Sequence, residues 1–352
     1  MNKVLIVYAS FGEGHKKAAY ALSGSIESTC KDLLDFTHPI IKKIYSLSYM
    51  LVTQHLSALW RITFFIAKGS LFSFSINKVH KFIFFSLFRY LKETRPKIVV
   101  VTHFFPSSLI SIVKEKFNIK LISVVTDLRV HPLWVDKCVD TYFVALSITK
   151  NDLIKLGIDA NKIISGYVPL REGFIKNYSV ERLRNKFKVG ARPSIIFVSS
   201  LRGRFPFLKV SIEKFIKKFN IFVIYGKNNE LKQYLEKNRS SNLRAFSFYE
   251  EIWELFFLSS VIITKPGGLT IFEGIYNRKP FIFTHYIPGQ EKENMDLLIK
   301  HGIAKFVRNE SELIEAIKYF GKKSDDIRDN YPIKIEDIRL PFIELIQKLS
   351  NA

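Results

Sequence analysis

The chain has 352 residues, 47% of them hydrophobic, which is enough for two cores and excludes a largely disordered protein. Its 54 lysines and arginines against 32 acidic residues give a net charge of +22, so we expect a polyanionic partner, either nucleic acid or an anionic membrane surface. The two cysteines, Cys30 and Cys138, show neither metal-ligand spacing nor a disulfide framework, and no secretory signal begins the sequence. These features predict a reducing, cytosolic location.

The first half of the chain alternates between strand-like and helix-like segments. An apolar run at residues 3–8 predicts a buried parallel strand, and a glycine-containing loop at 9–15 leads into an alanine-rich helical pattern. Further strands are predicted at 98–101, 121–125 and 141–144, with helical stretches between them. Such alternation favours a parallel sheet, so residues 1–170 are expected to form one α/β domain.

Within this domain, the segment 40–91 is too apolar and aromatic for a surface loop. Its uncharged stretch at 44–60 is short and polar for a membrane span, which needs about 20 mainly apolar residues. Phenylalanines among basic residues are typical of amphipathic helices in a lipid headgroup region, although a core, a dimer surface or a lid would show the same pattern. The residues concerned are Phe64, Phe65, Phe72, Phe74, Phe82, Phe84, Phe85 and Phe88, with Arg61, Lys68, Lys78, Lys81, Arg89 and Lys92.

A second α/β series begins beyond residue 170. After a polar helix candidate at 180–188, strands are predicted at 194–198, 221–225, 243–246, 261–264 and 281–283, with helices between them. Residues 171–330 are therefore expected to form a second doubly wound domain. A last helix is predicted at 335–349.

The most informative motif is Thr264-Lys265-Pro266-Gly267-Gly268-Leu269-Thr270, which follows the apolar run 261–263. A buried strand that breaks at Pro-Gly-Gly and restarts as a helix presents free backbone N–H groups and the positive end of the helix dipole. This arrangement predicts an anion site, most naturally for phosphate, although an isolated Pro-Gly-Gly is usually a plain turn. A second polar turn, at 287–294, follows the next strand at the ligand-binding edge of such a sheet.

The run from Thr264 to Gly302 resembles the donor-binding signature of nucleotide-sugar glycosyltransferases of the GT-B fold, an α/β fold of two Rossmann-like doubly wound domains facing across a cleft. It is most similar to the branch of monogalactosyldiacylglycerol synthases and processive diacylglycerol β-glucosyltransferases, and more distantly to the peptidoglycan N-acetylglucosaminyl transferase. The resemblance covers nearly the whole chain. It implies that 40–91 faces acceptor and membrane, and that the helix in 331–352 packs back on the first domain.

The resemblance also implies catalytic residues. Ser10-Phe11-Gly12-Glu13-Gly14-His15 is similar to the glycine-loop histidine motif of the family, which makes His15 the candidate base; a capping or phosphate-contacting histidine is the alternative. A positive helix end lowers an imidazole pKa and favours the neutral form that a base needs. Asp127, in a block at 125–134 that resembles another family segment, could orient His15 or the acceptor, or could cap a helix.

For the donor, backbone N–H groups at Gly267, Gly268 and Leu269, assisted by Thr270, are expected to hold the diphosphate without a metal, since no Asp-x-Asp motif is present. Lys265 is either a phosphate cation or a solvated turn lysine. By resemblance, Glu273 takes the ribose hydroxyls and the later polar turn contacts the sugar; helix surface or capping roles are the alternatives. The donor-binding candidates are Gly14, Gly203, Lys265, Gly267, Gly268, Leu269, Thr270, Glu273, Gln290, Glu291 and Asn294.

One loop departs from the family pattern. The first strand of the second domain runs into Ser199-Ser200-Leu201-Arg202-Gly203-Arg204-Phe205, where the family usually has a glycine-rich turn. Only Gly203 remains. The two arginines could replace backbone contacts to the diphosphate, or the change could signal altered or weakened donor use.

The resemblance implies an inverting, metal-independent transferase that needs no cofactor and moves glucose or galactose from its UDP-sugar to diacylglycerol, at the cytoplasmic face of the cell membrane as a peripheral protein bound to anionic lipids. One alternative is a UDP-N-acetylglucosamine transferase with a polyprenyl-linked acceptor, and another is a non-catalytic, membrane-bound nucleotide-sugar-binding pseudoenzyme. Nucleotide-sugar 2-epimerases share the fold but have no need of a lipid face. Nucleic-acid binding is not expected, because the charge is spread along the chain without a recognised motif.

Overall fold

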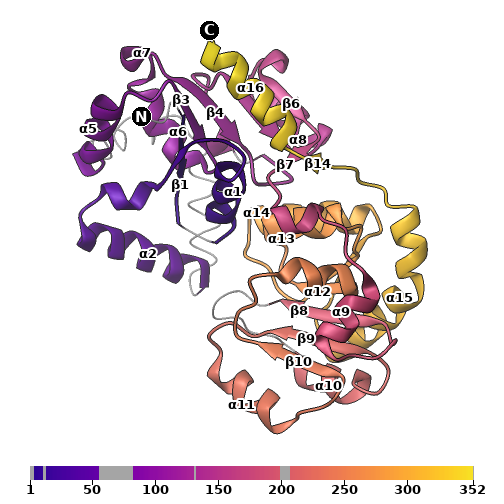
Figure 1. Cartoon of the computed structure of the whole chain (residues 1–352). Helices are drawn as coiled ribbons and strands as arrows, with labels where there is room; N and C mark the ends of the chain where they lie inside the picture. The colour runs from indigo at the N-terminus through magenta and orange to yellow at the C-terminus, as the bar shows by residue number, and fades with distance from the viewer. Residues whose placement is uncertain (1–3, 11–12, 55–81, 131, 199–206, 352) are drawn as a thin grey trace. The chain divides into compact units, whose positions relative to one another are not determined.

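The computed structural model describes the chain except residues 1–3, 11–12, 55–81, 131, 199–206 and 352 (Figure 1). The chain divides into two compact units. Unit 1 contains Met1–Arg171, Ile287–Glu293 and Ile335–Ala352, and unit 2 contains Glu172–Tyr286 and Asn294–Lys334.

Unit 1 is built on a six-stranded parallel sheet with the strand order β2-β1-β3-β4-β5-β6. Its strands are β1 (Val4–Tyr8), β2 (Thr29–Asp32), β3 (Ile98–Val101), β4 (Lys120–Val124), β5 (Thr141–Val144) and β6 (Ile163–Ser165). The chain reverses its direction of strand addition between β1 and β3. In a doubly wound sheet, ligands bind at the carboxyl ends of the strands beside such a reversal.

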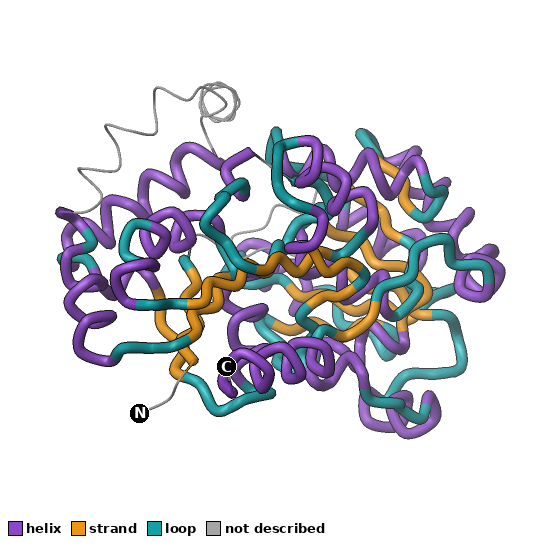
Figure 2. The backbone as a smooth tube through the Cα atoms, turned by 90° about the horizontal axis from the view of Figure 1, so that it is seen from above, coloured by secondary structure: helices purple, strands orange, loops and turns teal. Residues whose placement is uncertain are grey.

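Helices cover both faces of this sheet, as the tube view also shows (Figure 2). Since side chains alternate along a strand, Leu5 and Val7 of β1 pack in one core with Leu87 and Leu91, whereas Val4 and Ile6 pack in the other with Leu22. The helices of unit 1 are α1 (Glu13–Ser23), α2 (Pro39–Gln54), α5 (Phe85–Thr94), α6 (Phe104–Ser111), α7 (Lys114–Phe117), α8 (Ser147–Lys155) and α16 (Arg339–Asn351), with short 3-10 helices at Leu33–Phe36, Pro132–Trp134 and Ala160–Lys162.

The C-terminal segment belongs to unit 1. The short strand β14 (Glu336–Asp337) pairs with β7 (Tyr167–Val168), and the Glu336 N–H donates to the Gly166 carbonyl at 2.8 Å. Beyond it, Phe342 of α16 is fully buried, and its ring lies 6.2 Å from that of Phe143 on β5. Helix α16 therefore completes the second core of unit 1, on the face of the sheet that Leu22 of α1 also covers.

Unit 2 holds a second six-stranded parallel sheet, with the order β10-β9-β8-β11-β12-β13. The direction in which strands are added to the sheet reverses between β8 and β11. Ligands are therefore expected at the carboxyl ends of these two strands. Helices α10 and α15 pack on one face with Ile195 and Val223, and Phe187 of α9 contacts Phe222 from the other side of β9. The elements are β8 (Ser194–Val198), β9 (Asn220–Ile224), β10 (Leu243–Phe246), β11 (Ser259–Thr264), β12 (Phe281–Phe283), β13 (Ala304–Phe306), α9 (Val180–Phe187), α10 (Leu208–Phe215), α11 (Asn229–Lys237), α12 (Ile252–Leu258), α13 (Gly268–Tyr276) and α15 (Glu310–Asp329), together with α14 (Gln290–Lys300), which belongs to unit 2 from Asn294 onward.

The predicted α/β class with two doubly wound parallel sheets is confirmed. In the two six-stranded sheets, the sequence patterns did not predict β2, β6 and β13, each of which lies at an edge of its sheet; the short pair β7 and β14 was also not predicted. Edge strands are short and have one open side, so they lack the continuous apolar run that marks a buried strand. The sequence of β2, TCKD, is the clearest case.

The segment 40–91 is described only at its two ends. Phe84 is fully buried and Phe88 packs against the same core, whereas Phe82 and Phe85 are 87% and 59% exposed. Part of the aromatic pattern therefore reflects core packing, which was one of the alternatives. Phe64, Phe65, Phe72 and Phe74, with Arg61, Lys68, Lys78 and Lys81, lie outside the described residues. Among the helices described, none is long and apolar enough to span a bilayer.

The packing of α16 gives a stability prediction. We expect Phe342→Ala to lower the free energy of unfolding by roughly 3–5 kcal/mol, the usual effect of truncating a fully buried phenylalanine. Leu340→Ala, on the same helix but 69% exposed, should change it by less than about 0.5 kcal/mol. Chemical denaturation of both variants measures the difference, and equal losses would show that α16 does not contribute to the core as described.

Candidate functional site

His15 lies in the first turn of α1, directly after the loop that follows β1. Its Nδ1 is 2.9 Å from the carbonyl oxygen of Thr102 and 3.0 Å from the hydroxyl oxygen of Thr126. The Thr102 hydroxyl in turn donates to the His15 carbonyl at 2.9 Å. Since a carbonyl can only accept, we assign the ring proton to Nδ1, and the lone pair of the neutral ring is then on Nε2.

Burial lowers the pKa of His15 to about 4, although the hydrogen bond to the Thr102 carbonyl opposes this shift. The imidazole is therefore neutral at pH 7. A neutral ring with a fixed Nδ1–H and a lone pair on Nε2 is the form in which histidine accepts a proton from a substrate.

His103 lies against His15 and caps α6. Its Nδ1 accepts a hydrogen bond from the Phe105 N–H at 3.1 Å, which leaves the ring proton on Nε2. The two histidine rings meet edge to face, with centroids 4.5 Å apart. Burial holds the pKa of His103 well below its usual range, so both rings are neutral near pH 7. His103 thus has a structural role as a helix cap beside the candidate base.

Asp127 lies just beyond β4, at the same edge of the sheet. Its Oδ2 accepts a hydrogen bond from the Trp134 indole N–H at 2.8 Å, and in the described part of the chain its buried Oδ1 has no hydrogen-bond partner. Burial raises the pKa of Asp127 to about 7. Among the residues that the structure describes, the His15 ring is hydrogen-bonded to Thr102 and Thr126 and not to Asp127, so a catalytic role for this carboxyl stays a prediction. Trp134 is fully buried and serves the core.

In unit 2, α13 begins at Gly268 with Gly267 as its N-cap and no side-chain cap. The Gly267 N–H donates to the Lys265 carbonyl at 2.8 Å, and the first N–H to find an acceptor within the helix is that of Ile271, bonded to the Gly267 carbonyl at 3.0 Å. The amides that lack an acceptor in the helix are therefore those of Gly268, Leu269 and Thr270. The Gly267 N–H is bonded within the turn in this structure, so its predicted contact with a diphosphate stays a prediction.

The start of α13 is fixed to the sheet by close packing and by Asn294. A Cβ atom at Gly274 would lie 2.3 Å from Cζ of Phe281, so only glycine allows the helix to approach β12 this closely. Asn294 is completely buried, and its Nδ2 donates to the Pro266 carbonyl at 3.3 Å. The open amides are consequently held at the carboxyl edge of β11, where a helix N-terminus suits an anion.

The other donor-binding candidates that the structure describes lie on α13, in the loop before it, on α14 and on α1. Glu273 is buried on α13, and Lys265 is partly buried in the loop before it. The Glu291 carboxylate accepts from the Ile287 N–H at 2.8 Å, and Gln290 opens α14. These positions agree with either capping or ligand contact, so their donor roles stay predictions. Gly14 is the second residue of α1, whereas Gly203 and its altered loop lie outside the described residues.

Thr102 and Thr126 were not among the sequence-based candidates. Each follows a strand at the edge where His15 lies, which is the signal that could have identified them. The residues described contain no group of three or more His, Cys, Asp or Glu side chains arranged for a metal, and Cys30 and Cys138 are free thiols.

Comparison with known proteins assigns both halves of the chain. Residues 15–168 match the monogalactosyldiacylglycerol (MGDG) synthase family, and residues 197–329 match the glycosyltransferase family 28 C-terminal domain. A processive diacylglycerol beta-glucosyltransferase of Bacillus cytotoxicus is 30% identical over 334 residues, which cover 90% of this chain and 84% of that protein.

Solved structures share the fold. MurG of Acinetobacter baumannii superposes with a TM-score of 0.59 at 15% identity, covering 98% of this chain and 99% of that one. UDP-GlcNAc 2-epimerase of Neisseria meningitidis, bound to UDP-GlcNAc, gives 0.56 at 17% identity over 99% and 100% of the two chains. The expected GT-B fold is thereby confirmed.

The environment of His15 gives a titration prediction. By NMR, we expect its imidazole to titrate near pH 4, not near 6.5, and to carry its proton on Nδ1, with His15→Asn used to assign the resonance. The unfolded chain binds this proton below about pH 6.5 and the folded chain only below about 4, so stability is lost as pH falls through that window. Titration near 6.5, or a proton on Nε2, would contradict the assigned geometry.

Proposed function

This chain belongs to the family of the processive diacylglycerol β-glucosyltransferases, and from that membership we propose that it transfers glucose or galactose from a UDP-sugar to the free hydroxyl of diacylglycerol. The observation that carries the proposal is the His15 ring, neutral and oriented through Nδ1 by Thr102 at the strand-order reversal of unit 1. The open amides of α13 support it from unit 2, because they suit a diphosphate.

In the proposed reaction, Nε2 of His15 removes the proton of the acceptor hydroxyl while that oxygen attacks the anomeric carbon of the sugar. The bond between this carbon and the diphosphate oxygen breaks, and UDP leaves. Attack opposite to the leaving group converts an α-linked donor into a β-linked glycolipid. The amides of Gly268, Leu269 and Thr270 stabilise the charge that develops on the diphosphate, which removes the need for a metal in this step.

The acceptor is proposed to be reached at a membrane. On α2, Ile40, Ile44 and Leu47 follow one another at helical spacing and are 63%, 58% and 44% exposed. Tyr45 of the same helix contacts the ring of Phe84, which brings the exposed Phe82 and Phe85 to the same part of unit 1. Exposed apolar side chains on a chain of net charge +22 suit an anionic lipid surface, at the cytoplasmic face.

The activity itself is tested with purified protein, diacylglycerol in vesicles, and UDP-glucose, UDP-galactose or UDP-N-acetylglucosamine in separate reactions. We expect hexosyl-diacylglycerol by mass spectrometry, unaffected by EDTA. His15→Ala should lower kcat about 10²- to 10⁴-fold, the usual contribution of a general base, without changing the Kd for UDP.

His301→Ala, which removes an exposed histidine in unit 2, is the matched control and should retain full activity. Full activity of His15→Ala would remove His15 as the base. If no donor yields a glycolipid, the diacylglycerol proposal is wrong, and a polyprenyl-linked acceptor or a non-catalytic role takes its place.

Membrane contact is tested by cosedimentation with vesicles containing phosphatidylglycerol. Replacing two exposed apolar side chains with charges, as in Ile44→Glu with Leu47→Glu, should weaken binding by roughly tenfold or more. Ile154→Glu, on α8 of the same unit and also exposed, is the control and should bind like the unchanged protein. Equal binding by all three proteins would exclude α2 from the membrane surface.

A further inference from the structure

Unit 1 contains a groove of about 420 Å³, a volume within the range of small-molecule sites. One wall is the face of α6 that carries Phe104, Ser108 and Ser111, which lie four and three residues apart. The other wall is residues 133–138, which we call the strap. The complete lining is Phe104, Ser108, Ser111, Ile112, Leu133, Val135, Asp136, Lys137 and Cys138.

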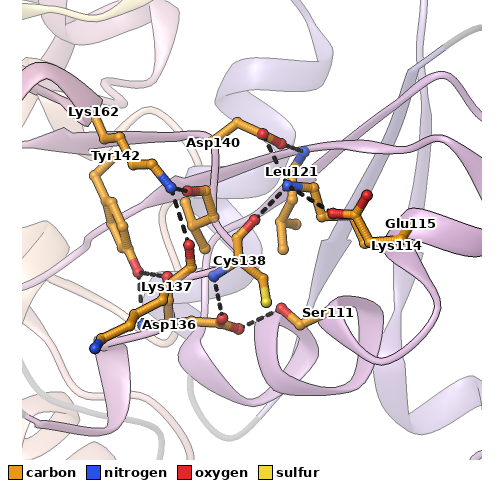
Figure 3. Close-up of polar contacts among 11 residues, drawn as sticks. Ser111, Lys114, Glu115, Leu121, Asp136, Lys137, Cys138, Asp140, Tyr142 and Lys162 are labelled. Carbon is orange, nitrogen blue, oxygen red and sulfur yellow. Dashed lines mark hydrogen bonds and ion pairs between the residues drawn. The ribbon is translucent and has the colours of Figure 1, made fainter. Parts of the chain in front are cut away.

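The strap is held in place by hydrogen bonds from three side chains (Figure 3). The Tyr142 hydroxyl accepts from the Asp136 N–H at 2.9 Å and lies 3.0 Å from the Trp134 carbonyl, to which it donates. Lys114 donates to the Cys138 carbonyl at 2.6 Å, and Lys162 donates to the Lys137 carbonyl at 3.0 Å. Since these bonds fix the strap backbone from several sides, the groove is formed before any ligand binds.

Three polar side chains of the lining, those of Ser108, Ser111 and Asp136, are bonded within the walls, whereas Lys137 is exposed and keeps its charge at the rim. The Asp136 carboxylate accepts from the Ser111 hydroxyl and from the Cys138 N–H at 2.9 Å (Figure 3). The Ser108 hydroxyl donates to the Phe105 carbonyl at 3.0 Å. An occupant is therefore offered mainly the apolar surfaces of Phe104, Ile112, Leu133 and Val135, which suit a hydrocarbon segment better than a polar ligand.

The groove is connected to the candidate base through two ring contacts. The His15 and His103 rings are 4.5 Å apart, and the His103 and Phe104 rings are 4.2 Å apart. Phe104 is itself part of the groove wall. The groove and the candidate base therefore lie in the same unit, separated by the rings of His103 and Phe104.

We infer that this groove holds one acyl chain of the diacylglycerol acceptor. The inference rests on the proposed function for the identity of the lipid. The acyl chain then contributes apolar binding energy at a distance from the reacting hydroxyl. The groove therefore determines which acyl chains are accepted.

The first test is acyl-chain selectivity. Ser108 is an exposed position of α6, and Ser108→Leu adds methyl groups to the groove without burying a new polar group. We expect it to raise the KM for long-chain diacylglycerol by roughly tenfold, with a smaller effect on dioctanoylglycerol and none on the KM for the UDP-sugar. Ser311→Leu, at an exposed position of α15, is the matched control.

The second test does not require activity. In a Cys30→Ser background, Cys138 is the remaining thiol and lines the groove, so dioctanoylglycerol in mixed micelles should slow its alkylation by N-ethylmaleimide severalfold. A Ser311→Cys reporter in a variant that also carries Cys30→Ser and Cys138→Ser corrects for general shielding by micelles, and its alkylation should be unchanged.

These outcomes distinguish a failure of the groove inference from a failure of the proposed function. Glycolipid synthesis with equal chain selectivity in Ser108→Leu and Ser311→Leu, and with no protection of Cys138, would overturn the groove inference and leave the proposed function intact. Protection of Cys138 without any glycolipid product would overturn the proposed function and support the groove as a lipid-chain site. Neither product nor protection would reject both.

Discussion

The parallel pairing of β1 with β3 is the constraint on which the site of unit 1 depends. Pairing in register, with Val7 opposite Val101, ends both strands at one edge of the sheet. The loops that follow must therefore meet there, and the His15 ring comes within hydrogen-bond distance of the Thr102 carbonyl, 87 positions away in the chain. The strand pairing thus places the carbonyl from which the tautomer of this imidazole is assigned.

Unit 2 also has a strand-order reversal at the edge where its candidate site lies, but with different chemical groups. Between β8 and β11 the strand order reverses, and the residues after β11 supply main-chain donors in place of a titratable ring. Main-chain amides carry a fixed dipole at every pH, whereas the charge of the imidazole depends on pH, and burial extends its neutral state down to about pH 4 by lowering its pKa. The proposed division of labour between the units is therefore a permanent positive field for the leaving group and a proton acceptor that burial keeps uncharged.

Much of this arrangement could be predicted from sequence, and the exceptions have physical causes. Buried central strands such as β3 and β11 are recognisable in the sequence as apolar runs. His15 and the Pro-Gly-Gly turn each belong to a short, contiguous motif, which can be read without knowledge of the fold. The edge strand β2 could not be predicted, because one open side relaxes the need for apolar residues. Thr126 was missed because its role depends on a contact with His15 across the sheet. In the aromatic segment, sequence alone could not separate the buried Phe84 from the exposed Phe85, since a shift of one position reverses the exposure.

Gly274 has a consequence that extends beyond packing. The distance between the sheet and α13 is set where the glycine hydrogen meets the Phe281 ring, and no side chain could occupy that space without displacing the helix or this buried ring. The position of the anion-binding turn is thus determined by a residue about two helical turns away that need never touch a ligand. A random mutagenesis screen for lost nucleotide binding would therefore return position 274 together with the turn itself, and a catalogue of ligand contacts would give no reason for it.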